Sequence, residues 1–209
     1  MNYESLIFDV DGTLWNALSL KAEAWNQMFV SEGIPQYCLT ESDVATLMGK
    51  TANEIADVLF SDISSQKERY AIMDRCTETE YCYLSKHKCE VGYEGVKKTI
   101  QKLAETHRIF VVSNCERGYP EICIEKMGLT PYIQGHLCHG DTRLSKGKTI
   151  RVLMERYHIE SCVYIGDTQH DYEATVEAGI PFIWASYGLG EPEKYTAKIH
   201  TFPELLDLC

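Results

Sequence analysis

The stretch at residues 6–15, L-I-F-D-V-D-G-T-L-W, constrains this 209-residue chain more than any other. Its first three residues form a short apolar run, which is typical of a buried strand. Asp9 and Asp11 follow directly, and carboxylates two positions apart on an extended chain point to the same side. Two such groups repel each other, so they favour a cation with oxygen ligands such as Mg²⁺. A surface turn at Asp11 and Gly12 is the alternative that this stretch alone leaves open.

The composition is that of a globular protein and argues against polyanionic partners. The sequence is 44% hydrophobic and has a formal net charge of −11, so we expect neither nucleic acid nor an anionic membrane surface as a partner. No apolar run is long enough to span a membrane, and no signal-like segment is expected. The nine cysteines include no C-x-x-C pair, which favours reduced thiols in the cytoplasm over a disulfide framework. The oligomeric state is unknown from the sequence.

Residues 16–87 have a helical pattern throughout. Apolar residues recur at helical spacing after Leu18, and Thr40 and Thr51 stand where helix caps are expected. A longer, charge-rich helix is predicted at about residues 66–85. We predict no strand in this part of the chain, and therefore an all-helical segment inserted directly after the acidic motif.

From Gly92 onward, predicted strands alternate with predicted helices. Runs rich in β-branched and aromatic residues stand at 108–112 and 162–165, with a weaker strand at 132–138 and a last one at 181–185. Alternation of this kind predicts right-handed crossovers and a mainly parallel sheet, which is the α/β class.

Polar residues follow the predicted strands, where the carboxyl ends of a parallel sheet meet at one edge. Their chemistry is complementary: one carboxylate can attack phosphorus, a second can move a proton, and a hydroxyl and a cation can hold phosphoryl oxygens. Further carboxylates can complete a Mg²⁺ site. Each group alone is more often ordinary loop, cap or surface chemistry. The candidates are Asp9, Asp11, Ser113, Asn114, Lys146, Asp167 and Asp171.

The order D-V-D-G-T, then S-N, then a Lys, then G-D-x-x-x-D resembles the haloacid dehalogenase-like hydrolase superfamily over nearly the whole chain. Its phosphoglycolate phosphatase-like branch is the most similar. The resemblance implies an α/β fold whose Rossmann-like, three-layer core has a mainly parallel sheet and consists of residues 1–15 and 88–209. It also implies a small, inserted, all-helical cap at residues 16–87.

The same resemblance implies a role for each candidate. Asp9 looks like the nucleophile that forms an aspartyl-phosphate, and Asp11 like the general acid and base, with its backbone carbonyl on Mg²⁺. The Ser113 hydroxyl, with Asn114, looks like a phosphate-binding group. Asp167 resembles a metal ligand and Asp171 an outer metal partner, and Lys146 completes the phosphate site.

One departure from the family concerns the lysine. Much of the family has K-P-x-P at this point, whereas this chain has S-K-G-K at residues 145–148. We predict that Lys146 is the phosphate-site lysine because it lies in the loop before the helix. Lys148 is the competitor, and we place it inside the helix start, on the surface.

The resemblance therefore predicts a Mg²⁺-dependent phosphatase that acts on a small phosphorylated metabolite. Asp11 argues against a dehalogenase, because the dehalogenases of the family lack this second carboxylate. Two alternatives stay open: a sugar phosphomutase, although those usually carry Glu where Gly166 stands, and a non-catalytic phosphate-binding regulatory protein. Lys50 is the cap residue that we would test first for contact with the leaving group.

Overall fold

The computed structural model describes residues 3–87 and 91–209. The chain divides into two compact units, Met1–Asn16 with Glu90–Cys209, and Ala17–Cys89. We refer to them as the core and the cap, and describe each by itself. The predicted return from cap to core, between residues 87 and 88, falls at segment 88–90, which lies outside the described residues.

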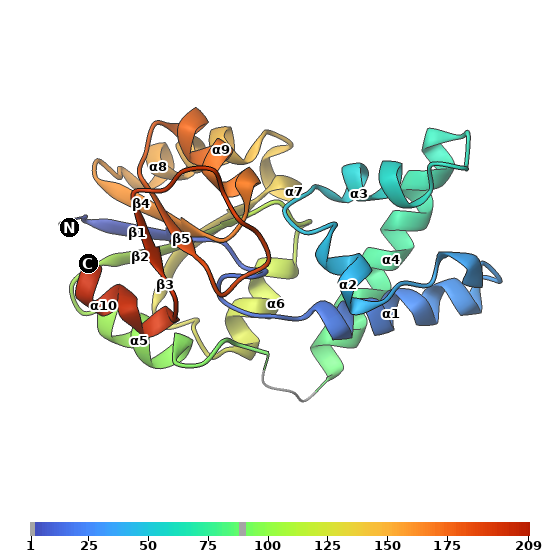
Figure 1. The fold of residues 1–209 in the computed structure, drawn as a ribbon, viewed down its shortest axis with the longest axis horizontal. Coiled ribbons are helices and arrows are strands. Elements are labelled where there is room, and N and C mark those ends of the chain that lie inside the picture. Colours follow the sequence, from blue (N-terminus) through green and yellow to red (C-terminus); the bar gives the residue numbers. More distant parts are fainter. Residues whose placement is uncertain (1–2, 88–90) are drawn as a thin grey trace. The chain divides into compact units, whose positions relative to one another are not determined.

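The core contains a six-stranded, all-parallel sheet with the order β3-β2-β1-β4-β5-β6 (Figure 1). Every residue of the short strands β1, β4 and β5 is buried, as expected for parallel strands that helices cover on both faces. The register pairs Phe8 with Val111 and with Ile165, so the carboxyl ends of three parallel strands lie near one another at one edge. The strands are β1 (Ser5–Phe8), β2 (Arg108–Ser113), β3 (Ile133–Cys138), β4 (Cys162–Gly166), β5 (Phe182–Ala185) and β6 (Ala197–Ile199).

Helices pack on both faces of this sheet and make the three-layer α/β arrangement (Figure 1). On one face, Ile150 and Leu153 of α8 join Ile7, Phe110 and Leu137 of the strands in one buried cluster. On the other, Phe8 packs against Phe202 with ring centroids 5.7 Å apart. The core helices are α5 (Val96–Leu103), α6 (Tyr119–Lys126), α7 (His139–Thr142), α8 (Lys146–Tyr157), α9 (Gln169–Ala178) and α10 (Leu205–Leu208), with a short 3₁₀ turn at Phe202–Glu204.

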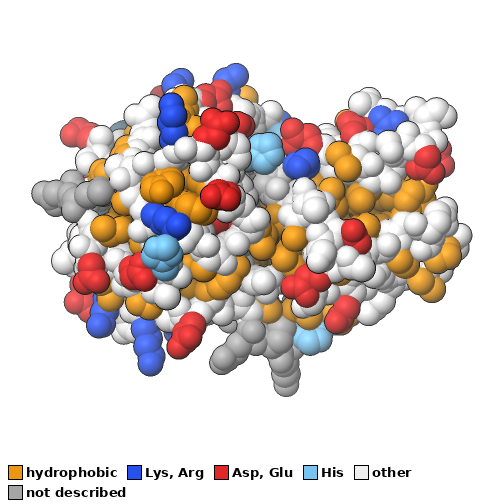
Figure 2. All heavy atoms as spheres, in the orientation of Figure 1, with side chains coloured by type: hydrophobic (Ala, Val, Ile, Leu, Met, Phe, Trp, Pro, Cys, Tyr) orange, Lys and Arg blue, Asp and Glu red, His pale blue; other side chains and the backbone are white. Residues whose placement is uncertain are grey.

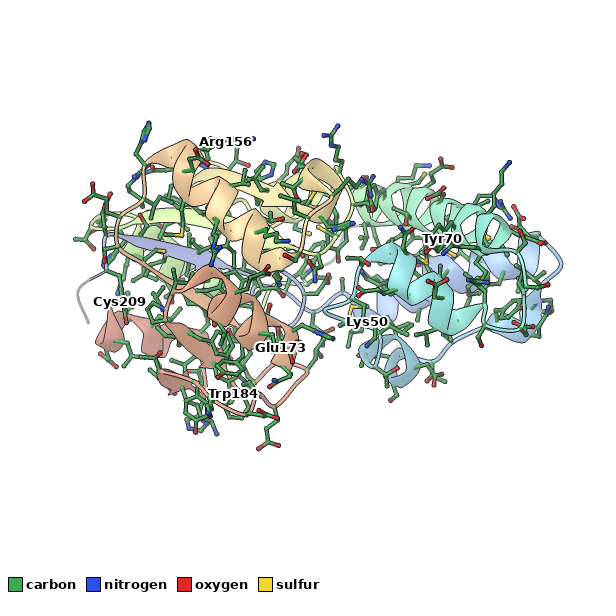
Figure 3. The ribbon with its side chains drawn as sticks, turned by 90° about the horizontal axis from the view of Figure 1, so that it is seen from above. Lys50, Tyr70, Arg156, Glu173, Trp184 and Cys209 are labelled. Atoms are coloured by element: carbon green, nitrogen blue, oxygen red, sulfur yellow. The ribbon has the colours of Figure 1, made fainter. Side chains whose placement is uncertain are left out.

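The cap is all-helical in the residues that the structure describes, and α4 packs against α1 and α3. Capping boxes begin two of its helices, at Thr40 with Asp43 and at Thr51 with Glu54. Figure 3 labels Lys50, whose amine donates a hydrogen bond to the Thr46 carbonyl oxygen 3.3 Å away within the cap. The cap elements are α1 (Leu18–Ser31), α2 (Glu41–Ala45), α3 (Ala52–Leu59), α4 (Gln66–Lys86) and a 3₁₀ turn at Pro35–Tyr37.

The predicted fold class is confirmed, and three local expectations need correction. Two elements were not predicted from the sequence: β6, whose three residues are too short to show a period, and the single-turn helix α7. Lys146 was expected in a loop, but it is the first residue of α8, after the N-cap residue Ser145. A lysine in a first helical turn is unusual because it faces the positive end of the helix dipole. Here two carboxylates hold it there, as described below.

The described residues include no helix that is long and apolar enough to cross a membrane. On the face seen in Figure 2, acidic and basic side chains are interspersed over the core. The cysteines that the structure describes, from Cys38 to Cys209, are free thiols.

Candidate active site

Asp9 and Lys146 form a buried ion pair at the carboxyl edge of the sheet. Asp9 directly follows β1, and its backbone N–H donates to the Ile165 carbonyl, which fixes it between β1 and β4. The Lys146 amine donates to Asp9 Oδ1 at 2.7 Å. The two residues are only 4% and 6% exposed, so the charges meet where water screens them little.

Asp171 is the second carboxylate on the Lys146 amine, with Nζ and Oδ1 2.5 Å apart. Its other oxygen accepts hydrogen bonds from the backbone N–H groups of Asp167 and Thr168 and from the Thr168 hydroxyl, at 3.1, 2.9 and 2.7 Å. Thr168 and Asp171 make the capping box at the start of α9. A local helix signal in the sequence thus also orients a charged side chain toward Lys146.

Asp167 completes the acidic cluster and is fully buried. The Thr13 hydroxyl donates to its Oδ1 at 3.2 Å, and the Leu189 backbone N–H donates to its Oδ2 at 2.7 Å. A Cβ atom on Gly12 would lie 2.1 Å from Asp167 Oδ2, and the Gly12 φ of +83° also favours glycine. The glycine of the D-G-T motif therefore makes room for a carboxylate that is distant in the sequence.

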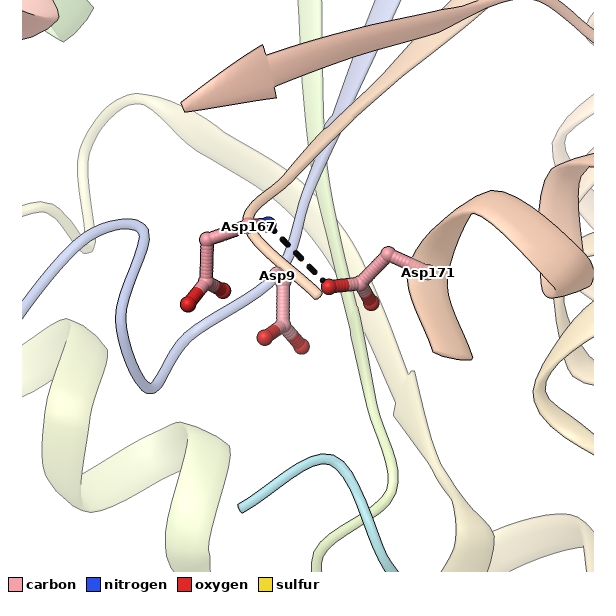
Figure 4. Close-up of side chains that lie close together, drawn as sticks. All are labelled: Asp9, Asp167 and Asp171. Atoms are coloured by element: carbon pink, nitrogen blue, oxygen red, sulfur yellow. Dashed lines mark hydrogen bonds between the residues drawn. The ribbon is translucent and has the colours of Figure 1, made fainter. Parts of the chain in front are cut away.

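Figure 4 shows Asp9, Asp167 and Asp171 gathered at one point, with ligand oxygens that all lie within 4.8 Å of one another. Burial raises the pKa of Asp9 to about 7 against the attraction of Lys146, and the Asp171 and Asp11 charges add to the rise. Burial and the same neighbouring carboxylates raise the pKa of Asp167 well above its usual range. Burial alone would raise the pKa of Asp171 too, but Lys146 and the Thr168 hydrogen bonds hold it below its usual range.

This donor set fits a hard cation such as Mg²⁺. Three buried carboxylates face one ammonium group, so the site is short of positive charge, and oxygen is the ligand that Mg²⁺ takes. Two carboxylates whose pKa values are raised by burial and by like charge would ionise fully beside a divalent ion.

The Asp11 side chain contacts two aromatic residues. Its carboxylate accepts hydrogen bonds from the Trp15 indole at 3.0 Å and from the Tyr119 hydroxyl at 2.6 Å. The role in metal binding that the resemblance implies for Asp11 concerns its backbone carbonyl, and it stays a prediction.

Ser113 and Asn114 lie where β2 ends, beside β1 in the sheet. Ser113 is the last residue of β2, is 6% exposed and pairs in register with Cys138 of β3. Asn114 follows it and is half-buried. The sheet therefore brings these two residues to the edge that also carries Asp9, and their binding of phosphate stays a prediction.

Tyr164 and the Leu189 backbone N–H also contact the cluster, and neither was predicted from the sequence. The Tyr164 hydroxyl lies 3.4 Å from Asp9 Oδ1 and donates to the Val112 carbonyl at 2.8 Å, and Lys146 Nζ lies 5.3 Å from the centre of its ring. The sequence did contain a signal for Tyr164. A tyrosine in an apolar strand just before G-D needs a buried partner for its hydroxyl, so it could have been expected to contact the site. The Leu189 backbone N–H left no signal, since any residue type supplies it.

Comparison with known proteins places these residues in a family. The family model described as "Haloacid dehalogenase-like hydrolase" matches residues 6–185. Two curated relatives are named phosphoglycolate phosphatase. The one from Xanthomonas campestris pv. campestris is 22% identical over 195 residues, which cover 88% of this chain and 83% of the relative. The one from Rhodobacter capsulatus is 22% identical over 209 residues, with 96% and 94% coverage.

Solved structures have the same fold. A predicted phosphoglycolate phosphatase from Haemophilus somnus superimposes with a TM-score of 0.83 at 20% identity, over 99% of this chain and 97% of that one. A putative haloacid dehalogenase-like hydrolase from Bacteroides fragilis gives a TM-score of 0.84 at 17% identity, over 98% and 100%. At these identities the likeness concerns the fold. The family model, in contrast, spans most of the sequence, from β1 to the end of β5, and the chain belongs to the haloacid dehalogenase-like hydrolases.

Proposed function

We propose that this protein is a Mg²⁺-dependent phosphatase that hydrolyses a small phosphomonoester through an aspartyl-phosphate on Asp9. The observation that carries the proposal is the buried contact of Asp9 with Lys146, inside a cluster that holds two more carboxylates. Relatives named phosphoglycolate phosphatase, at 22% identity, support the same reaction class.

Asp9 has one oxygen in use and one available. Oδ1 accepts the hydrogen bond from Lys146, whereas no hydrogen bond to Oδ2 is found in the part of the chain that the structure describes. We assign the nucleophile to Oδ2. Its attack forms the bond from Asp9 to phosphorus while the bond from phosphorus to the ester oxygen breaks. Lys146 is charged beside these carboxylates, because Asp171 and Asp9 outweigh its burial and raise its pKa above the usual range.

Asp11 donates a proton in the first step and accepts one in the second. As an acid it protonates the departing ester oxygen, which leaves as an alcohol and makes Asp11 a carboxylate. As a base it then takes a proton from water while the water oxygen attacks phosphorus. The bond to Asp9 breaks, inorganic phosphate leaves, and both aspartates return to their starting states.

Ser113 and Asn114, where β2 ends, and Lys146, at the start of α8, are the proposed donors to the phosphoryl oxygens. Asp9, Asp167 and Asp171, with the Asp11 carbonyl, would hold the ion. When bound, Mg²⁺ supplies positive charge that screens the phosphoryl oxygens from the carboxylates. The substrate is a small phosphorylated metabolite, and the cytoplasm is its proposed location, on the basis of the free thiols.

The test is phosphate release from a panel of phosphomonoesters, with 2-phosphoglycolate first because the relatives carry that name. We expect Mg²⁺-dependent release that EDTA abolishes and that Asp9→Asn lacks. Transfer of the phosphoryl group between two hydroxyls of a sugar would favour the phosphomutase. Binding of phosphate without turnover of any ester would favour the regulatory protein, and both outcomes would overturn the proposal.

A further inference from the structure

The carboxylate of Asp11 receives two hydrogen bonds on the same oxygen. The Trp15 indole N–H and the Tyr119 hydroxyl both donate to Oδ1, at 3.0 and 2.6 Å. Both donors are buried, with 0% and 1% of their surface exposed, and their rings meet edge to face at 5.6 Å. Neither contact follows from the family motif, in which only Asp11 is named.

The backbone fixes both donors. Trp15 forms a bridge with Asp11, since the Gly12 N–H donates to the Trp15 carbonyl at 2.9 Å and the Trp15 N–H donates to the Val10 carbonyl at 3.2 Å. Tyr119 begins α6 directly after Gly118, whose φ of +91° turns the chain into the helix. The two donors therefore come from separate, ordered segments, and the Asp11 carboxylate lies between them.

Each carboxylate oxygen has about two lone-pair sites for hydrogen bonds. On Asp11 Oδ1 both are taken, so a proton could bind there only if a buried donor lost its acceptor, which is unfavourable. The two buried donors therefore hold Oδ1, and with it the whole carboxylate, in one orientation.

We propose that Trp15 and Tyr119 are positioning residues: they hold the Asp11 carboxylate by Oδ1, in the orientation from which Asp11 delivers the proton to the leaving group and accepts one from water. This inference rests on the proposed function, because it assigns geometry to the same acid and base. It goes beyond that function by naming the two residues that orient Asp11.

The kinetic test uses substrates that differ in their need for a proton. An alkyl phosphate leaves as a strongly basic alkoxide unless Asp11 protonates it, whereas p-nitrophenyl phosphate has a good leaving group. In single-turnover phosphorylation of Asp9, we expect Tyr119→Phe to slow the alkyl ester about tenfold and the nitrophenyl ester about twofold or less, with KM nearly unchanged. Trp15→Phe should show the same pattern.

Two controls separate positioning from general damage. Tyr157→Phe makes the same chemical change in α8, where the ring packs on Phe110 away from Asp11, and should leave the rates of both esters unchanged. In an Asp11→Ala background, Tyr119→Phe should have almost no further effect on phosphorylation, because residues that act through one another are not additive. Equal losses for the two esters, or additive losses in the double variant, would overturn the inference.

A second readout does not depend on activity. The indole N–H resonance of Trp15 should shift when Asp11→Ala removes its acceptor, while those of Trp25 and Trp184 stay in place, since Trp25 donates to Glu80 and the Trp184 nitrogen has no partner in the described structure. If the wild-type enzyme is active but the Trp15 resonance does not shift in Asp11→Ala, the inference is overturned and the proposed function is not. A wild-type protein that hydrolyses no phosphomonoester overturns the proposed function, and the catalytic part of the inference with it.

Discussion

Lys146 Nζ lies 2.7 Å from Asp9 Oδ1, although the two residues are 137 positions apart in the sequence. The same amine contacts Asp171 at 2.5 Å, so one cation links the ends of β1, α8 and α9. Removal of one partner from a buried pair leaves an uncompensated charge, which is strongly unfavourable. The contact therefore matters to folding as well as to the proposed chemistry.

The first prediction separates the two lysines of the S-K-G-K segment. Lys146→Ala should lower kcat/KM about a hundredfold or more, comparable with the loss of one electrostatic donor in other active sites. Lys148 is exposed on α8, and Lys148→Ala should change kcat/KM less than about threefold, as expected for a surface charge. The measurement is steady-state hydrolysis at saturating Mg²⁺, with melting curves to confirm folding.

The two substitutions change the net charge equally, so a long-range field cannot explain a difference between them. Equal losses would mean that Lys146 has no special place in the chemistry. A larger loss at Lys148 would reverse the assignment of the two residues.

The second prediction concerns the nucleophile. Asp9→Asn keeps the size of the side chain but removes the charge that attacks phosphorus, so hydrolysis should fall by several orders of magnitude. Acid-quenched wild-type enzyme should carry a phosphoryl group during turnover, and the variant should carry none. Turnover near the wild-type rate in Asp9→Asn would remove Asp9 from the mechanism.

Most of the core followed from local sequence signals. The runs R-I-F-V-V and C-V-Y-I became the central strands β2 and β4, because buried parallel strands need continuous apolar sequence. In the cap, the expected helix caps at Thr40 and Thr51 marked helix starts that the structure contains. The features that were not predicted are short, such as β6, or depend on contacts distant in the sequence, such as the start of α8 at Lys146.

The candidate site was predictable only in part, for a physical reason. Sequence motifs identify the residues that follow strands, and a parallel topology brings such residues to the carboxyl edge of the sheet. Nothing local in the sequence joins Tyr119 to Asp11, because that contact depends on how α6 is oriented beside the motif. The Thr13 hydroxyl and the Leu189 N–H on Asp167 likewise depend on tertiary structure.

The third prediction is that the acidic cluster destabilises the metal-free fold. Burial and the neighbouring carboxylates raise the pKa of Asp167 well above its usual range, so the folded state disfavours its charge. A raised carboxyl pKa means that stability falls as pH rises from the unfolded value toward the folded one. In EDTA at pH 8, Asp167→Asn should therefore raise Tm by about 2–4 °C or more.

The pH dependence provides the check on this third prediction. The Tm advantage of Asp167→Asn should be small near pH 4 and should grow as pH rises, because asparagine does not titrate. Mg²⁺ should raise the wild-type Tm more than that of the variant. Asp207→Asn removes an exposed carboxylate and is the matched control, with little change expected. A variant less stable than wild type in EDTA at every pH contradicts the idea.

The fourth prediction concerns a buried ion pair in the cap. The Lys21 amine lies 3.0 Å from Glu80 Oε1, and the Trp25 indole donates to the other Glu80 oxygen at 2.8 Å. Lys21→Met should lower the free energy of unfolding by about 3 to 5 kcal/mol, because it leaves the Glu80 charge buried without its cation. Urea titration followed by circular dichroism measures the loss.

The same helix α4 offers a matched control for the ion pair. Arg75 pairs with Glu32 at 2.9 Å, but both side chains are more than one-third exposed. Arg75→Met should therefore lower the free energy of unfolding by less than about 1 kcal/mol. Adding Glu80→Gln to Lys21→Met should restore much of the lost stability, and a double variant as unstable as the sum of both changes would contradict the charge argument.

The last prediction concerns Gly166, which stands where related phosphomutases usually carry Glu. A Cβ atom at this position would lie 2.6 Å from Asp171 Cγ, closer than real contacts allow. Gly166→Ala should therefore displace the carboxylate that Lys146 contacts and lower kcat/KM about tenfold or more, since small displacements at a reacting centre are costly. Gly92→Ala is the control, because its Cβ would meet only ordinary contacts at 3.6 Å or more. If Gly166→Ala kept full activity with Asp171 displaced in its crystal structure, the contact between Lys146 and Asp171 would be dispensable for turnover. Full activity with Asp171 in place would instead show that the backbone of β4 yields to the added methyl group.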